Sequence, residues 1–351
     1  MKRVLCLLID QLTGHWEESV TIRGTDLPPV NLDGYHRLGL IPHFSHLIEN
    51  GLWVKKPWNR GGCATQYGMR YLATGSYKSD IYFENDGWRP CCYEKELTSF
   101  TEAISRNCKD SGRSFVSGVF GSLRWTDDFL SDSCYIQYPP DGCNDETMLT
   151  EHAIPWLGKT RDWNLAIVYF PQMDAIGDAG WEGEENAWVF NPALAPPDFV
   201  EPRENRIRSK HDYLMVLDAL AGELITFLKR EDFWEETYII VTSDHGAHLG
   251  CSVAAELGAK TDNLWIGHPS PYDCEVWDFE DDKSAGIYSG GPRRVSFIVS
   301  GGGLDEQLKG TFVEEAEIID VAPTIADIFG VTFECEGKSI LKNPGIKSQK
   351  P

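Results

Sequence analysis

The chain has 351 residues, of which 42% are hydrophobic and 25% charged, as in an ordinary soluble globular protein. Its 54 acidic and 32 basic residues give a formal net charge of -22, which disfavours nucleic acid or an anionic membrane surface as a partner. No run approaches eighteen apolar residues, and MKRVLCLLID at the start is too short for a signal segment. We therefore expect a cytoplasmic protein without a membrane span, whose 10 cysteines are reduced.

Short apolar segments alternate with helical patterns along the chain, which is typical of β-α-β units. β-Branched and aromatic residues predict strands at 4–9, 52–54, 114–119, 165–170, 238–242 and 295–299. Apolar spacing and end signals predict helices at 42–50, 99–110, 204–230 and 318–329. The pattern predicts an α/β fold in which helices sandwich a central, mostly parallel sheet.

The length of the chain fits a single α/β domain, which we place at residues 1–345, with a tail at 346–351. Two stretches inside it look irregular, at about 180–203 and 261–291, and both are rich in aromatic and acidic residues. Long irregular segments are uncommon in compact domains unless they have a function. We therefore expect them to be inserted loops that shape a substrate pocket.

Acidic residues follow three of the predicted strands. The strand at 238–242 leads into Asp244 and His245, Asp10 directly follows the first strand, and Asp174 comes four residues after the strand at 165–170, with Asp178 one turn later. Ligands of open α/β sheets bind at the carboxyl ends of the strands. Carboxylates and an imidazole converging there could hold two cations about 4 Å apart, although each acid alone could equally be a helix cap or a loop residue.

A glycine turn, Gly61-Gly62-Cys63-Ala64, leads into Thr65 and a helix that ends at Gly75. A hydroxyl at the start of a helix lies where backbone N–H groups and the helix dipole attract an oxyanion. Thr65 is therefore a candidate site residue, although a plain helix N-cap would show the same local pattern.

These segments, taken in order, resemble the alkaline phosphatase superfamily, and specifically its branch of sulfatases, type I phosphodiesterases/nucleotide pyrophosphatases and phosphonate hydrolases. Ile9-Asp10 resembles the first metal aspartate, and IPHFSHLIENG at 41–51 resembles the helix T-P-N-L-D-x-L-A-x-x-G. Residues 211–246 resemble the long helix and D-H-G strand, RVSFIV at 294–299 the strand R-V-P-F-I-V, and IDVAPTI at 319–325 the helix D-x-x-P-T-L. The resemblance runs nearly end to end and implies an alkaline-phosphatase-like fold.

The resemblance also bears on the nucleophile. Sulfatases carry a cysteine, processed to formylglycine, in C-x-P-S-R ahead of L-x-T-G, and counting back from Leu72-Ala73-Thr74-Gly75 puts Thr65 at that position. Cys63 lacks the proline and arginine at the expected offsets. The resemblance thus implies a phosphodiesterase-like threonine nucleophile, and proximity in sequence makes Arg70 and Asn85 candidates to hold the substrate oxygens.

By the same resemblance the protein is expected to bind two divalent metal ions, Zn2+ or Mn2+. One ion would be held by residues from the first strand, the glycine turn and the D-H-G strand, and the other by the acidic segment after the strand at 165–170 and a later histidine. The residues implied are Asp10, Thr65, Asp244 and His245 for one ion, and Asp174, Asp178 and His268 for the other.

The second ion's residues depart from the family pattern. D-x-x-G-H appears here as Asp174-Ala175-Ile176-Gly177-Asp178, so an aspartate stands where a histidine is expected. An added carboxylate would favour manganese or magnesium over zinc, or Asp178 would be a solvated loop residue. For the last ligand we favour His268, in Trp265-Ile-Gly-His-Pro, over His248 because it lies where the family usually places this ligand.

The function that we expect is hydrolysis of a phosphodiester, phosphomonoester or phosphonate in a small-molecule substrate, with the hydroxyl of Thr65 as nucleophile. A sulfatase-like hydrolase or a phosphomutase on the same fold is the alternative among enzymes. A metal-depleted pseudoenzyme or binding module is the non-enzyme alternative, and the aspartate at position 178 is its best support.

Overall fold

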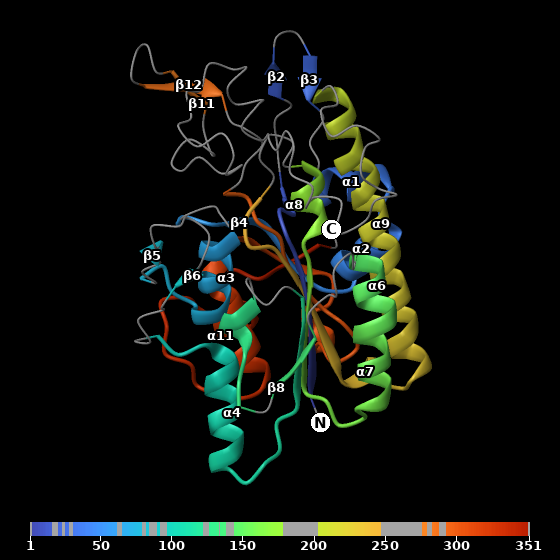
Figure 1. Ribbon diagram of the computed structural model, residues 1–351, viewed down its shortest axis with the longest axis vertical. Coiled ribbons are helices and arrows are strands. Elements are labelled where there is room, and N and C mark those ends of the chain that lie inside the picture. The colour runs from blue at the N-terminus through green and yellow to red at the C-terminus, as the bar shows by residue number, and fades with distance from the viewer. Residues whose placement is uncertain are drawn as a thin grey trace.

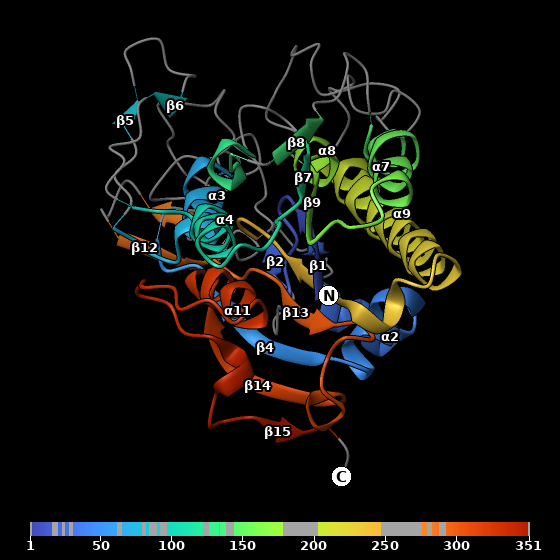
Figure 2. The same cartoon turned by 90° about the horizontal axis from the view of Figure 1, so that it is seen from below.

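The computed structural model describes residues 2–15, 31–61, 65–78, 97–121, 126–132, 134–137, 144–177, 203–246 and 293–349, together with short strands elsewhere. A nine-stranded sheet in the order β15-β14-β4-β13-β10-β1-β9-β7-β8 lies at its centre (Figures 1 and 2). β13 and β15 run antiparallel to their neighbours, and the other pairs are parallel. The predicted mostly parallel sheet is confirmed.

The strands of this sheet are mostly short. They are β1 (Arg3–Ile9), β4 (Leu52–Trp58), β7 (Ser117–Phe120), β8 (Cys134–Gln137), β9 (Leu165–Phe170), β10 (Thr237–Thr242), β13 (Phe297–Ser300), β14 (Thr311–Glu317) and β15 (Lys347–Ser348). Three separate two-stranded sheets join β2 (Val20–Ile22) to β3 (Thr25–Leu27), β5 (Tyr82–Phe83) to β6 (Pro90–Cys91), and β11 (Val276–Asp278) to β12 (Lys283–Ile287).

Helices cover both faces of the sheet (Figure 1). One face carries α1 (Leu32–Leu38), α2 (Pro42–Glu49), α6 (Asp145–Thr147), α7 (Ile154–Lys159) and α9 (Arg203–Arg230). The other carries α3 (Thr65–Thr74), α4 (Phe100–Asp110) and α11 (Val321–Ile328). α8 (Gln172–Gly177) follows the C-terminal end of β9, and a π-helical segment, Met148–Ala153, joins α6 to α7. None of the described helices combines the length and apolar character needed to cross a membrane.

β1 shows why the central strands are uninterrupted apolar segments. Leu5, Leu7 and Ile9 belong to the core under α1, α2 and α9, whereas Val4, Cys6 and Leu8 belong to the core under α3, α4 and α11. Successive side chains of a strand point to opposite faces, so a strand covered on both sides needs apolar residues at every position. The same burial on both faces explains the apolar sequences of β9 and β10.

A long-range contact caps α2. Ile41 stands at the N-cap of this helix and gives no side-chain hydrogen bond. Asp218 of α9 accepts instead from the backbone N–H groups of Phe44, at 2.7 Å, and His43, at 3.3 Å. Two of the N–H groups that a helix start leaves without partners are thereby satisfied, which fixes α2 against α9.

The structure adds elements that the sequence pattern did not reveal. β14 carries exposed Glu314 and Glu315, which hide its strand character, and α1 and the helical segment at 145–159 were also unpredicted. Lys347–Ser348, inside the expected tail, pairs with β14. Of the two irregular stretches, 180–202 lies outside the described residues and 261–291 is described only at β11 and β12.

Candidate metal centre

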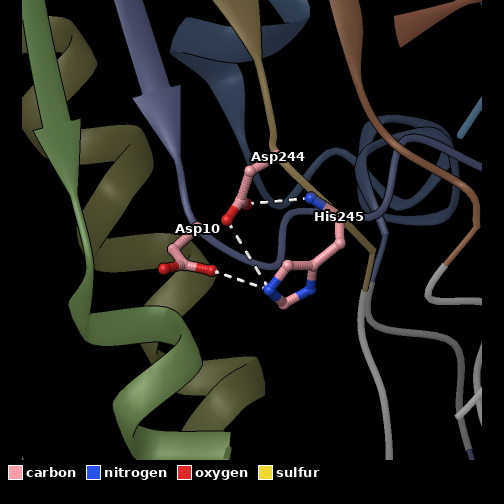
Figure 3. Close-up of side chains that lie close together, drawn as sticks. All are labelled: Asp10, Asp244 and His245. Carbon is pink, nitrogen blue, oxygen red and sulfur yellow. Dashed lines mark hydrogen bonds and ion pairs between the residues drawn. The ribbon is translucent and has the colours of Figure 1, made fainter. Parts of the chain in front are cut away.

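Two neighbouring strands deliver acidic side chains to the same edge of the sheet. β1 and β10 run parallel with Leu8 opposite Thr242, so the residues that follow them emerge together. These are Asp10 after β1, and Asp244 and His245 after β10, which are 2%, 0% and 0% exposed. In Figure 3 both carboxylates and the imidazole turn toward a common point.

Oxygen atoms of Asp10, Asp244 and Thr65 all lie close to the Nε2 atom of His245. Asp10 Oδ1 lies 3.2 Å from it and Asp244 Oδ2 lies 3.6 Å from it (Figure 3). The hydroxyl of Thr65, at the first residue of α3, is 3.4 Å from the same nitrogen. Four predicted residues from three separate segments therefore meet in one buried cluster.

Hydrogen bonds occupy one oxygen of each carboxylate. Asp10 Oδ2 accepts from the hydroxyl of Tyr169, and Asp244 Oδ1 accepts from the backbone N–H groups of His245, at 2.9 Å, and Gln11, at 3.3 Å. The other two oxygens, Asp10 Oδ1 and Asp244 Oδ2, are buried and have no hydrogen-bond partner among the residues that the structure describes. Because buried polar atoms normally have partners, an oxygen left over on each acid indicates a ligand.

The imidazole is also oriented for coordination. His245 Nδ1 lies 3.0 Å from the backbone oxygen of Gly246, a carbonyl that can only accept. With the proton on Nδ1, the lone pair of Nε2 faces the two carboxylates. A ring nitrogen fixed by a carbonyl in this way is the usual arrangement of a metal-binding histidine.

The charges of the cluster fit a bound cation. Burial, followed by repulsion from Asp244 and Asp174, holds the pKa of Asp10 well above its ordinary value. Burial and the nearby Asp174 raise the pKa of Asp244 to about 7. Buried carboxylates this close are costly unless positive charge compensates them. Ligand atoms of Asp10, Asp244 and His245 lie within 4.8 Å of one another, and carboxylate oxygens with an imidazole nitrogen are ligands that divalent metal ions accept.

Gly68 allows α3 to approach the cluster. It lies one turn after Thr65, and a Cβ atom placed on it would be 2.1 Å from the backbone oxygen of Asp244. Any side chain at this position would therefore push the helix, and Thr65 with it, away from His245. The side chain of Asn59 supports the same segment by donating to the backbone oxygen of Asp244 at 3.3 Å.

Gln11 connects the cluster to Asp174. Its φ of 61° lies in the left-handed region, which residues with a side chain adopt uncommonly. This turn directs its backbone N–H to Asp244 and its side-chain amide to Asp174 Oδ1, at 2.5 Å. Asp174, in the first turn of α8, is thus adjacent to the cluster without belonging to the group of three ligand atoms.

The predicted site residues fall into three groups according to where they lie in the structure. It brings Asp10, Thr65, Asp244 and His245 together, and it places Asp174 beside them. Arg70, suggested by its proximity to Thr65, forms an ion pair of 2.6 Å with Asp128 in which the two side chains are 6% and 7% exposed. The remaining candidates lie outside the described residues: Cys63, Asn85, Asp178, His248 and His268.

Three residues of this site were missed by the sequence reasoning. A glycine inside a helix lowers the stability of the helix by about 1 kcal/mol relative to alanine. Gly68, inside the predicted helix, could therefore have been recognised as a sign that another part of the chain packs closely there. Nothing in the sequence marks Tyr169 as a site residue, because tyrosines are common in the buried strands of protein cores. Gln11 is informative only through its backbone conformation, which no local pattern specified.

The fold and this cluster define an α/β protein in which buried oxygen and nitrogen atoms that could hold a metal ion lie at the carboxyl edge of the sheet. Residues 120–260 match the family described as type I phosphodiesterase / nucleotide pyrophosphatase. A putative extracellular sulfatase Sulf-1 homolog of Caenorhabditis elegans is 28% identical over 145 residues. That alignment covers 41% of this chain and 16% of the relative, so the match spans only a small part of the relative's length.

Solved structures show the same fold over almost the whole chain. A phosphonate monoester hydrolase of Agrobacterium radiobacter has a TM-score of 0.58 at 14% identity, with 97% of this chain and 76% of that chain covered. Murine ectonucleotide pyrophosphatase / phosphodiesterase 5 has a TM-score of 0.55 at 15% identity, with 99% and 100% covered. Together with the family match over residues 120–260, these similarities show that the chain has the fold of the alkaline phosphatase superfamily, whose members include sulfatase-like proteins.

Proposed function

We propose that this protein is a metal-dependent hydrolase of the phosphodiesterase/sulfatase kind, and that it cleaves a phosphate ester through the hydroxyl of Thr65. The observation that carries the proposal is the convergence of Thr65, Asp10 and Asp244 on His245 Nε2 in a buried cluster. Within the described part of the chain, each of the two acids keeps one oxygen there without a hydrogen bond. A cation and a hydroxyl side by side are the parts that such a reaction requires.

The residues would divide between two cations. Asp10, Thr65, Asp244 and His245 would hold the first. Asp174, which Gln11 joins to this cluster, would hold the second together with Asp178 and His268. Bound divalent cations supply a lowered pKa for the threonine hydroxyl and positive charge for the substrate's oxygens.

The chain's own residues account for the rest of the reaction. The Oγ1 oxygen of Thr65 attacks phosphorus as the bond to the leaving oxygen breaks, and the proton that Oγ1 gives up passes through solvent to the leaving oxygen. Water then attacks the phosphothreonine, which releases phosphate or its monoester and returns the proton to Thr65. Gly68 keeps Oγ1 in place by letting α3 rest on the backbone of Asp244. Asp244 and His245 are fully buried and Asp10 is almost fully buried, so bulk water is kept away from the acids.

A variant of one structural neighbour supports a threonine as the nucleophile. An inactive variant of the murine phosphodiesterase 5, in which a threonine is replaced by alanine, has been solved in complex with AMP. Its fold matches this chain with a TM-score of 0.56. A nucleotide-like phosphodiester is therefore the first substrate to test.

The activity experiment compares Thr65→Ala with Thr74→Ala, a matched control in the same helix. Thr74 is also buried, and its hydroxyl donates to the backbone oxygen of Arg70 at 2.7 Å. With Zn2+ or Mn2+ added, aryl phosphomonoester and phosphodiester turnover is expected to fall at least about a thousand-fold in Thr65→Ala. Thr74→Ala is expected to keep most of it. Full turnover in Thr65→Ala would rule out the threonine nucleophile.

A sulfate ester is the second candidate substrate, because the C. elegans relative is described as a putative sulfatase. Sulfatase chemistry would use Cys63 after its conversion to formylglycine. Aryl sulfate and aryl phosphodiester are therefore assayed side by side with Thr65→Ala and Cys63→Ala. Loss of sulfate hydrolysis in Cys63→Ala, with Thr65→Ala unaffected, would favour this second function.

A further inference from the structure

Tyr169 is a buried tyrosine that the proposed reaction does not use. It lies on β9, is 1% exposed, and donates its hydroxyl hydrogen to Oδ2 of Asp10. The phenol is therefore a hydrogen-bond donor toward one oxygen of Asp10.

Strand pairing explains how the phenol reaches this carboxylate. β1 and β9 are parallel with Leu8 opposite Tyr169, and the pairing continues as the N–H of Asp10 donates to the backbone oxygen of Phe170 at 3.0 Å. Side chains alternate along a strand, so Leu8 and Asp10 point to the face on which Tyr169 also lies. The contact is therefore a consequence of the sheet's register.

The hydrogen bond decides which oxygen of Asp10 faces the cluster. A carboxylate with neither oxygen fixed can turn about its terminal bond and exchange them. With Oδ2 held by Tyr169, Oδ1 is left facing His245 Nε2 at 3.2 Å. Asp244 shows the same division, because backbone N–H groups hold its Oδ1 and leave Oδ2 facing the imidazole.

We propose that Tyr169 is a positioning residue for the cation site, whose hydroxyl orients the Asp10 carboxylate so that Oδ1 is the oxygen presented to the cation. This inference rests on the proposed function, since it requires a cation bound by Asp10, Asp244 and His245. Tyr169 acts through Asp10 and does not itself contact the cation. Residues that orient metal ligands typically change metal affinity about 10–100-fold when they are removed.

Tyr213 offers a matched control. It is also 1% exposed, and its hydroxyl donates to Oδ2 of the buried Asp145 at 2.5 Å. Asp145 does not belong to the cluster of Asp10, Asp244 and His245. Tyr213→Phe therefore removes the same kind of hydrogen bond from a buried acid without touching a proposed ligand.

The test is a Zn2+ titration of the metal-free full-length protein in competition with a chromophoric chelator. Tyr169→Phe is expected to weaken binding of the tighter ion about 10–100-fold, whereas Tyr213→Phe is expected to bind within about two-fold of the parent. Parental affinity in Tyr169→Phe, or an equal loss in both variants, would overturn the role of Tyr169 and leave the proposed function standing. A parent protein that binds neither Zn2+ nor, in the same titration, Mn2+ would overturn both.

A second measurement needs only a nearly isosteric change, so it does not depend on the folding of Tyr169→Phe. 3-Fluorotyrosine is incorporated at position 169 or at position 213, and the fluorine resonance is followed as Zn2+ is added. The resonance at position 169 is expected to shift with one equivalent of Zn2+, because the bonded carboxylate transfers charge to the ion. The resonance at position 213 is expected to stay in place. Bound Zn2+ with an unmoved resonance at position 169 would contradict the proposal.

Discussion

Two buried tyrosine–aspartate pairs in this protein look alike but differ in what surrounds the acid. Tyr169 donates to Asp10 in the core beneath α3 and α4, and Tyr213 donates to Asp145 in the core beneath α9. Burial raises the pKa of both acids. Low exposure and a raised pKa therefore do not distinguish a ligand site from a structural acid.

The hydrogen-bond partners do distinguish them. Asp145 and Gln172 bond to each other reciprocally, since the N–H of Asp145 donates to the Gln172 side chain at 2.8 Å and Asp145 accepts from the backbone of Gln172. Tyr213 donates into the same network. Asp10 instead keeps one buried oxygen that has no hydrogen bond to any described residue and is directed at His245. The unsatisfied oxygen, more than burial, therefore indicates a cation site.

Of the effects that separate the two pairs, the loss of Zn2+ binding when Asp10 is neutralised should be the greatest, and neutralising Asp145 is its control. Asp10→Asn removes one charged ligand and is expected to weaken Zn2+ binding by more than about a hundred-fold. Asp145→Asn is expected to bind Zn2+ like the parent, because its carboxylate is engaged within the protein. Isothermal titration of the metal-free proteins checks both. Equal losses in the two variants would remove the distinction between the two pairs.

The next effect concerns the close packing of α3 against the cluster of Asp10, Asp244 and His245. Gly68→Ala forces a methyl group against the backbone of Asp244, so it is expected to lower the free energy of unfolding by about 1–3 kcal/mol and to reduce kcat. Gly158 of α7 is the control, since a Cβ atom there would meet Phe227 at an ordinary 3.6 Å. Gly158→Ala is expected to be neutral or to stabilise by up to about 1 kcal/mol. Urea unfolding and turnover measure both variants, and a harmless Gly68→Ala would contradict the packing argument.

The last and weakest effect is a pH dependence of the free energy of unfolding, which arises from Asp145, the partner of Tyr213. Burial raises the pKa of Asp145 from 3.8 to about 7, so the folded protein keeps a proton that the unfolded chain releases. The protonated Asp145 contributes fully to the free energy of unfolding below about pH 4, and this contribution is lost as the pH rises from 4 through 7. Asp145→Asn should therefore gain about 1–2 kcal/mol relative to the parent between pH 5 and pH 8.

Urea unfolding of the parent and Asp145→Asn at both pH values measures this difference. Asp162→Asn is the control, because Asp162 is exposed and its replacement changes the net charge in the same way. A difference between Asp145→Asn and the parent that stays constant from pH 5 to pH 8 would show that Asp145 is ionised in the folded protein throughout.

Much of the fold could be predicted because it depends on local patterns. The apolar strands at 4–9, 165–170 and 238–242 were read correctly, since burial on both faces requires apolar residues at every position. β14 was missed because Glu314 and Glu315 break that pattern. Its strand character comes from pairing with β4, a contact that no local segment specifies.

The order of residues along the chain shows which side chains stand at the strand ends, and this order was enough to predict Asp10, Asp244, His245 and the nearby Thr65. Long-range packing sets which oxygens of the two acids remain available and how closely α3 approaches them. The register of β1 against β9 brings Tyr169 to Asp10, and the packing at Gly68 brings Thr65 to His245. These contacts join residues far apart in the chain, so their geometry follows from strand order and close packing and not from local sequence.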